Sequence, residues 1–163
     1  MPTIARLAVK ILARALVVAV AMGILSVPGP ALAGGLINAT FLGGTAIEGH
    51  DPVAYFTEGK PVEGSSAHTH QWKGATWKFS TKENRDAFAA APQKFAPQYG
   101  GYCAWGVAQD SVVGIDPEAW RIVDGKLYLN YSTSIHDWWA IDIPGNIAKG
   151  DANWPEIAAN LAK

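Results

Sequence analysis

Cys103 is the one residue in this sequence whose type could do chemistry on its own. It is the only cysteine among 163 residues, and it lies in a glycine-rich and aromatic stretch, YGGYCAWG, from Tyr99 to Gly106. Glycine permits positive φ and close backbone approach, so we expect a sharp turn here. Tyr99, Tyr102 and Trp105 could then wall in the thiol and leave one side open. A thiolate is a nucleophile and a ligand for soft metals, whereas a protonated cysteine is often a small buried apolar residue.

Histidines supply the other candidate metal ligands. His68 and His70 are two residues apart in a segment that alternates like a strand, so both imidazoles lie on one face, a spacing compatible with copper, zinc or nickel. His50 and His136 could join Cys103 only if the fold brings the segments together. One histidine pair lacks the ligand number of a structural site, and the alternative is that it occupies the exposed face of a hairpin. The candidate metal ligands are therefore Cys103, His50, His68 and His70.

A thiol-dependent enzyme or redox protein is a second hypothesis. Gln98 and Cys103 weakly resemble the neighbourhood of a papain-type nucleophile, where a glutamine stabilises the oxyanion and a thiolate attacks. The spacing of the glutamine does not match that pattern, and His136 could act as the base only by proximity. The chain also contains no phosphate-binding loop and no dinucleotide fingerprint.

An aromatic binding surface is a third hypothesis. The chain has seven tryptophans, and Trp138 and Trp139 are adjacent in a segment predicted to be helical. Neighbouring helical side chains point about 100° apart, so at least one ring must point away from the packing face of the other. Aromatic side chains usually fill the core, whereas an exposed pair indicates a surface that binds a partner.

Residues 1–33 are predicted to be a secretory signal peptide. Basic residues come first, an apolar run follows at residues 15–25, and Ala31-Leu32-Ala33 has the small-x-small pattern of a cleavage site. The apolar run is short for a membrane span of about 20 residues. We therefore expect a periplasmic or secreted protein with one domain, residues 34–163, and no membrane span after signal removal.

Composition limits the partners of residues 34–163. This part of the chain carries 10 Lys and Arg against 14 Asp and Glu, a net charge of −4 with neutral histidines. Such a charge argues against a nucleic-acid surface, which would be basic. A single cysteine excludes an internal disulfide, so the thiol is free, bound to a metal, or paired with another molecule. The expected partners are a metal ion or a periplasmic protein.

Two hairpins are predicted from alternating strand-like segments. The first runs from His68 to Phe79 through a turn at Lys73-Gly74, and the second runs from Trp120 to Asn130 through Asp124-Gly125. Asp-Gly suits a type I′ turn. Residues 107–115 are expected to form a loop or an edge strand, and residues 116–119 a turn.

Three helices are expected around these hairpins. The first runs from Thr81 to about Ala90, with Ser80 and Glu83 as a capping box. The second follows a cap at Ser132 or Ser134 and ends at Pro144-Gly145. The third begins at residues 153–155 and runs to about residue 162. The fold class is therefore α+β: a small single domain of short antiparallel hairpins packed with several short helices.

Six segments in order resemble those of exported bacterial YHS-domain proteins. They are Gly49–Phe56, Trp72–Phe79, Asn84–Phe88, Phe95–Cys103, Asp124–Asn130 and Asp142–Ala148. The resemblance covers nearly all of residues 34–163. It implies a small α+β unit in which a hairpin, a helix and the cysteine turn pack together.

The resemblance also implies a function in metal handling. YHS and related cysteine-rich domains are associated with transition metals, copper especially, and usually present more than one cysteine. This chain has only Cys103, and His50 stands where similar proteins commonly have tyrosine. The resulting expectation is a non-catalytic protein that binds copper, or zinc, through Cys103, with a histidine or a partner chain supplying further ligands. The thiol enzyme and the aromatic interaction module remain as alternatives.

Overall fold

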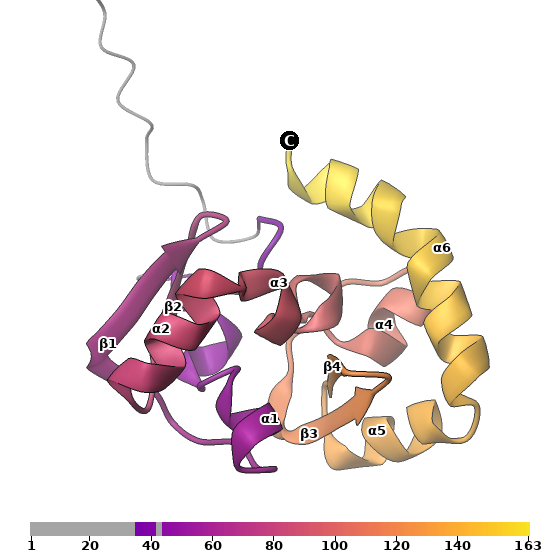
Figure 1. The fold of residues 1–163 in the computed structure, drawn as a ribbon. Helices are drawn as coiled ribbons and strands as arrows, with labels where there is room; N and C mark the ends of the chain where they lie inside the picture. Colours follow the sequence, from indigo (N-terminus) through magenta and orange to yellow (C-terminus); the bar gives the residue numbers. More distant parts are fainter. Residues whose placement is uncertain (1–34, 42–43) are drawn as a thin grey trace, which may run out of the picture.

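The structure is a computed structural model that describes residues 35–41 and 44–163. The predicted signal peptide, residues 1–33, lies outside the described residues. Figure 1 shows a hairpin with its packed helix on one side and a second hairpin, with the long C-terminal helix around it, on the other. The predicted α+β class is confirmed. No helix in the described ranges is long and apolar enough to cross a membrane.

Both predicted hairpins are present. β1 (Ser65–Trp72) pairs with β2 (Ala75–Phe79), and β3 (Asp116–Val123) pairs with β4 (Lys126–Asn130), each antiparallel. The two central residues of each turn have positive φ, as a type I′ turn requires: 49° and 77° in the first hairpin, 51° and 73° in the second. The turn predicted at residues 116–119 is wrong, because these residues begin β3 and meet β4 with an irregular register.

Six α-helices and two short 3-10 helices accompany the hairpins in the described part. Their bounds are η1 (Ile47–Gly49), α1 (Ala54–Thr57), α2 (Lys82–Ala90), α3 (Pro92–Phe95), η2 (Gln98–Gly101), α4 (Ala104–Ala108), α5 (Thr133–Ala140) and α6 (Ile143–Leu161). α4 extends to Ala108 and so includes the start of residues 107–115, for which the sequence predicts a loop or an edge strand.

The cap of α2 differs by one residue from the prediction. The hydroxyl of Thr81, not that of Ser80, accepts the backbone N–H of Asn84 at 3.1 Å. The backbone N–H and hydroxyl of Ser80 instead donate to the fully buried carboxylate of Asp51, at 2.8 and 2.7 Å. The same carboxylate accepts from the side-chain amide of Asn84 and the backbone N–H of Val53, each at 2.8 Å. Asp51 therefore fixes the chain before α1 against the start of α2.

The two C-terminal helices divide differently from the prediction. Ser132 caps α5 as expected, accepting from the backbone N–H of Ile135. Pro144 does not end a helix: it lies in the first turn of α6, where proline's missing N–H is not needed, and Asp142 caps that turn. Pro155 lies inside α6, which continues through it. The predicted helix start at residues 153–155 is therefore wrong.

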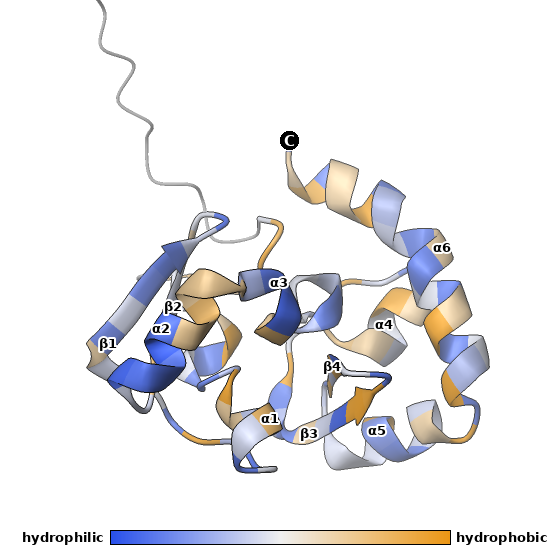
Figure 2. Cartoon of the chain, in the orientation of Figure 1, coloured by the Kyte–Doolittle hydropathy of each residue, from blue (hydrophilic) through white to orange (hydrophobic). Residues whose placement is uncertain are grey.

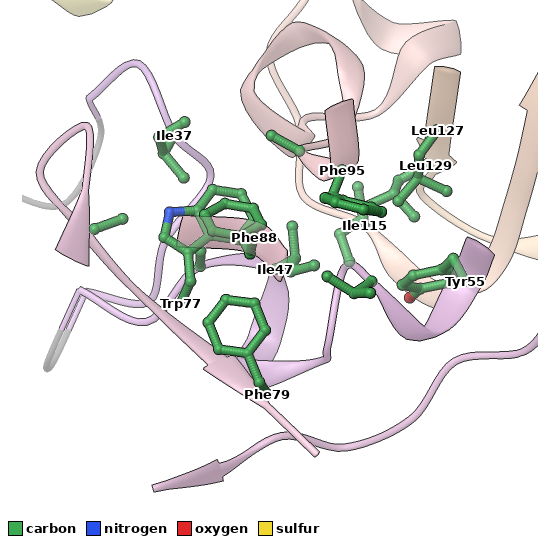
Figure 3. Close-up of a cluster of buried hydrophobic side chains, with 14 of the residues drawn as sticks. Ile37, Ile47, Tyr55, Trp77, Phe79, Phe88, Phe95, Ile115, Leu127 and Leu129 are labelled. Carbon is green, nitrogen blue, oxygen red and sulfur yellow. The ribbon is translucent and has the colours of Figure 1, made fainter. Parts of the chain in front are cut away.

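The core consists of two adjoining clusters. Figure 3 shows the first, where Trp77, Phe79 and Phe88 pack between the β1–β2 hairpin and α2. The second lies between β4, α5 and α6, with Tyr128 and Trp139 at ring centroids 5.4 Å apart. α4 is mostly hydrophobic in Figure 2, whereas β1 is mostly hydrophilic. The segment around Cys103 contributes side chains to both clusters, so the described chain forms one domain.

Candidate functional site

The turn before Cys103 has the sharp geometry that its glycines predict. Tyr99, Gly100 and Gly101 have φ of 53°, 62° and 82°, three consecutive residues in the left-handed region. The start of the described chain, residues 35–41, which we call the lead-in, crosses directly over them, and the backbone N–H of Asn38 donates to the carbonyl of Gly100 at 2.8 Å. A Cβ atom at Gly100 would collide with the carbonyl oxygen of Leu36. Glycine is therefore required both for the conformation and for the close approach of the backbone.

Cys103 follows this turn as the cap residue of α4. Its sulfur accepts the backbone N–H of Gly106 at 3.3 Å, and its side chain is 1% exposed. The thiol donates to the side-chain oxygen of Asn130 at a sulfur–oxygen distance of 3.8 Å. The same oxygen accepts the backbone N–H of Trp105 at 3.1 Å. Asn130, which the sequence did not single out, thus joins the last residue of β4 to the start of α4.

Burial raises the pKa of the Cys103 thiol above its ordinary value. Backbone N–H groups of Gly106, Tyr131 and Trp105 act in the opposite direction, because they stabilise the thiolate, but burial dominates. The thiol is therefore protonated near neutral pH. This environment is unlike that of reactive cysteines, whose pKa is lowered by nearby positive charge.

A cavity of about 290 Å³ opens beside the thiol. Cys103 and Gly106 form part of its lining, and the surrounding large side chains are Trp105, Val113, Tyr131 and Ile135. Among the described residues of its lining, the polar groups are the side chains of Gln109 and Ser111, the thiol and the Tyr131 hydroxyl. The cavity therefore suits an apolar group better than a charged one.

A second cavity of about 300 Å³ shares Trp105 with the first. Trp138 and Ile141 supply its other large apolar side chains, and Asp142 and Lys149 lie in its lining. We call the two cavities together the Trp105 surface. Its large side chains are Trp105, Val113, Tyr131, Ile135, Trp138 and Ile141.

The side chains of this surface are unusually open to solvent for their type. Tyr131 is 59%, Trp138 56% and Ile141 83% exposed, whereas Trp139 is fully buried. The prediction that the two adjacent tryptophan rings point in different directions is therefore confirmed. Trp105 itself is half-buried and packs against both hydrophobic clusters, which holds its ring in place between the two cavities.

Of the three aromatic residues expected around the thiol, the structure places only Trp105 at the cavity beside Cys103. Tyr99 is buried on the α6 side, where its hydroxyl donates to Asp151 at 2.9 Å and burial raises its pKa. The hydroxyl of Tyr102 donates to the carbonyl of Gly35 at 2.9 Å, and burial raises its pKa too. Both tyrosines belong to the second hydrophobic cluster, so they anchor the turn rather than line the cavity.

The histidines lie on other elements. His68 and His70 are half-buried on one face of β1, as their spacing predicts, and the ring of His70 packs edge-on against Phe88 with centroids 6.0 Å apart. They are thus not on the fully exposed face of the hairpin. His50 follows η1, and its Nδ1 is buried without a hydrogen-bond partner among the described residues. Within residues 35–41 and 44–163, no group of three or more His, Cys, Asp or Glu is arranged to hold a metal ion.

Comparison with protein-family models, curated proteins and solved structures finds no match for this chain. The YHS resemblance therefore stays a prediction from the sequence. The residues that sequence reasoning missed are Asn130, Val113, Tyr131, Ile135 and Ile141. They come from three segments that only the folded chain brings to Trp105, and no spacing in the sequence indicates that proximity.

Proposed function

We propose that this protein is a non-catalytic interaction module that binds an apolar segment of a partner protein on the Trp105 surface. The observation that carries the proposal is the pair of cavities that share Trp105. Among the seven large hydrophobic side chains that are exposed in the described part, four line these cavities: Val113, Tyr131, Trp138 and Ile141. Contiguous exposed apolar patches of this kind indicate interaction sites.

The chemistry of the surface favours a polypeptide partner over a small ligand. Each cavity is at the lower limit, roughly 300 Å³, of the range that holds small molecules. The large exposed fractions of Trp138 and Ile141 indicate a shallow site, which would leave much of a small ligand in water. Tryptophan and tyrosine are enriched at the centres of protein interfaces, where a few of them carry most of the binding energy. Two neighbouring apolar side chains of a partner would each fill one of the two cavities of the Trp105 surface.

In this proposal Cys103 is structural. Its protonated sulfur forms part of the floor of the first cavity and orders the start of α4 through Gly106 and Asn130. A buried thiol with a raised pKa gives no support to the nucleophile hypothesis. Copper handling through Cys103 remains a sequence-based hypothesis, and its further ligands would come from a partner chain or from a rearrangement of the site.

Peptide selection tests the proposal. Peptides displayed on phage and selected on the purified protein should be enriched in pairs of apolar residues. Their binding should weaken by about tenfold or more in Trp138→Ala and in Ile141→Ser, because interface hot spots contribute about 2 kcal/mol or more. Phe41→Ser is the matched control, since Phe41 is 79% exposed but lies outside the Trp105 surface. The proposal would be contradicted if the selected peptides bound Trp138→Ala and Ile141→Ser as tightly as they bind Phe41→Ser and the unaltered protein.

A further inference from the structure

A third cavity, larger than either part of the Trp105 surface and sharing no residue with it, lies on another side of the turn. Its volume is about 450 Å³. The lead-in, the β1–β2 turn, α3 with η2, and α6 all contribute to it, and Figure 1 shows α3 between the hairpin and α6. Among the described residues, its aromatic lining is Trp72, Tyr99 and Trp154, and its polar side chains besides the Tyr99 hydroxyl, which already donates to Asp151, are Lys73, Gln93 and Gln98.

The two tryptophans are held in fixed positions by the core. Trp72, at the end of β1, packs against Trp77 and Phe88, each with ring centroids 5.8 Å apart. Trp154, on α6, packs against Tyr99 at 5.8 Å and Tyr102 at 6.4 Å. Both indoles are half-buried and line the cavity. The site thus has two pre-positioned aromatic walls, one from each hydrophobic cluster.

The polar side chains of this cavity are available for hydrogen bonding. Neither the Gln93 nor the Gln98 amide has a hydrogen-bond partner within the part of the chain that the structure describes. Each amide offers two N–H donors and one carbonyl acceptor. The amino group of Lys73 lies over the Trp72 ring, 4.6 Å from its centroid, and adds further donors. The lining thus combines aromatic side chains with two neutral amides that both donate and accept and one ammonium group that only donates.

This combination restricts the class of ligand. Lys73 disfavours a cation, and a single amine without arginine is a poor match for a phosphate or nucleotide. No carboxylate lies in the described lining. A sugar ring has a face of C–H groups that stacks on an indole and a rim of hydroxyls that donate and accept. A purely aromatic ligand would make no use of the donors and acceptors of the two amides. We propose that this cavity binds a neutral saccharide between Trp72 and Trp154, with Gln93 and Gln98 bonded to its hydroxyls.

An NMR titration tests the saccharide site. Maltose, cellobiose and N,N′-diacetylchitobiose are added separately while the indole N–H signals of the tryptophans are recorded. At least one sugar should shift the signals of Trp72 and Trp154 with a Kd of about 1 mM. The signal of Trp139 should not move, because this residue is fully buried in the second cluster away from the cavity.

Glutamine variants test the role of the amides. Gln93→Ala changes an exposed residue of α3, so the protein should fold, and its affinity for the sugar should fall about fivefold because one hydrogen bond is lost. Gln109→Ala, in the lining of the Trp105 surface and away from this cavity, is the matched control and should bind sugar normally. The proposal is overturned if none of the three sugars shifts the two signals, if benzamide shifts them and the sugars do not, or if Gln93→Ala binds sugar unchanged. None of these results bears on peptide binding at the Trp105 surface.

Discussion

The side-chain oxygen of Asn130 lies 3.8 Å from the sulfur of Cys103, and both side chains are almost completely buried. Because that oxygen also accepts the backbone N–H of Trp105, one amide holds the thiol and the base of the Trp105 surface together. The lone cysteine is thus part of a hydrogen-bonded link between β4 and α4. The shape of the candidate binding surface depends on this link.

Replacing Asn130 should destabilise the protein. Asn130→Ala leaves the partly buried N–H of Trp105 without its acceptor and opens a small cavity, so we expect a loss of about 1–3 kcal/mol in the free energy of unfolding. Urea denaturation measures this loss. Asn160→Ala, an exposed change near the C-terminus, is the control. If both variants unfold at the same urea concentration as the unaltered protein, Asn130 does not hold the site.

The Cys103 thiol should react slowly. Its ordinary pKa is 9.0 and burial raises it, so the thiolate is scarce at pH 8. Alkylation by iodoacetamide should be slower in the folded protein than in urea, because the thiol is buried and its raised pKa lowers the thiolate fraction. Equal rates in the folded and unfolded protein would support the thiol-enzyme hypothesis instead.

The same raised pKa predicts a loss of stability in alkali. Folding favours the protonated thiol. The contribution of Cys103 to the free energy of unfolding is therefore complete below pH 9.0 and is lost as the pH rises through the higher pKa of the folded state. Tyr55 and Tyr99 also have pKa values raised by burial, from an ordinary 10.0, and add to the loss at still higher pH. Cys103→Ala should therefore make the unfolding free energy depend less steeply on pH above pH 9. An identical pH dependence in the variant would show that the thiol does not contribute.

Much of the fold follows from local sequence signals, but the site does not. Lys73-Gly74 and Asp124-Gly125 define both hairpins because a type I′ turn needs two residues of positive φ. The α2 cap is ambiguous by one residue because Ser80 and Thr81 can both cap, and the tertiary bond from Ser80 to Asp51 decides between them. The two prolines of α6 lead to wrong predictions of where helices begin and end, because Pro144 lies in the first turn of α6 and Pro155 lies inside it.

The site depends on contacts between distant residues. Tyr99, Tyr102 and Trp105 lie within seven residues of one another, yet only Trp105 lines the cavity beside Cys103, whereas both tyrosines pack against Trp154 on α6. Asn130 and Tyr131 reach the thiol only through the pairing of β3 with β4. Such proximity is set by the packing of the two clusters, and spacing in the sequence does not encode it.

The copper hypothesis has a direct test. It predicts that the reduced protein binds Cu(I) under anaerobic conditions and that Cys103→Ser loses this binding, with release of the thiol proton on coordination. Equal binding by both would place the metal on other ligands, of which His68 and His70 share one face of β1. No binding by either would end the hypothesis for the isolated chain and leave only a site completed by a partner.

The buried carboxylate of Asp51 should be essential for stability. Its neighbours all donate to it, so Asp51→Asn would turn an amide N–H₂ toward other N–H groups and should cost about 2–3 kcal/mol. Asp137→Asn is the control, because its side chain is 80% exposed. Thermal unfolding followed by circular dichroism compares the two. A variant at Asp51 that melts at the same temperature as the control would contradict this role.

The two adjacent tryptophans of α5 should behave in opposite ways. Trp139 is fully buried against Tyr128, so Trp139→Ala should lower the free energy of unfolding by about 3–5 kcal/mol, whereas Trp138→Ala should change it by less than about 0.5 kcal/mol. Trp138→Ala should nevertheless weaken binding of the selected peptides. A stability loss in Trp138→Ala comparable to that in Trp139→Ala would mean that Trp138 is a core residue, and the Trp105 surface would then lose one wall of its second cavity.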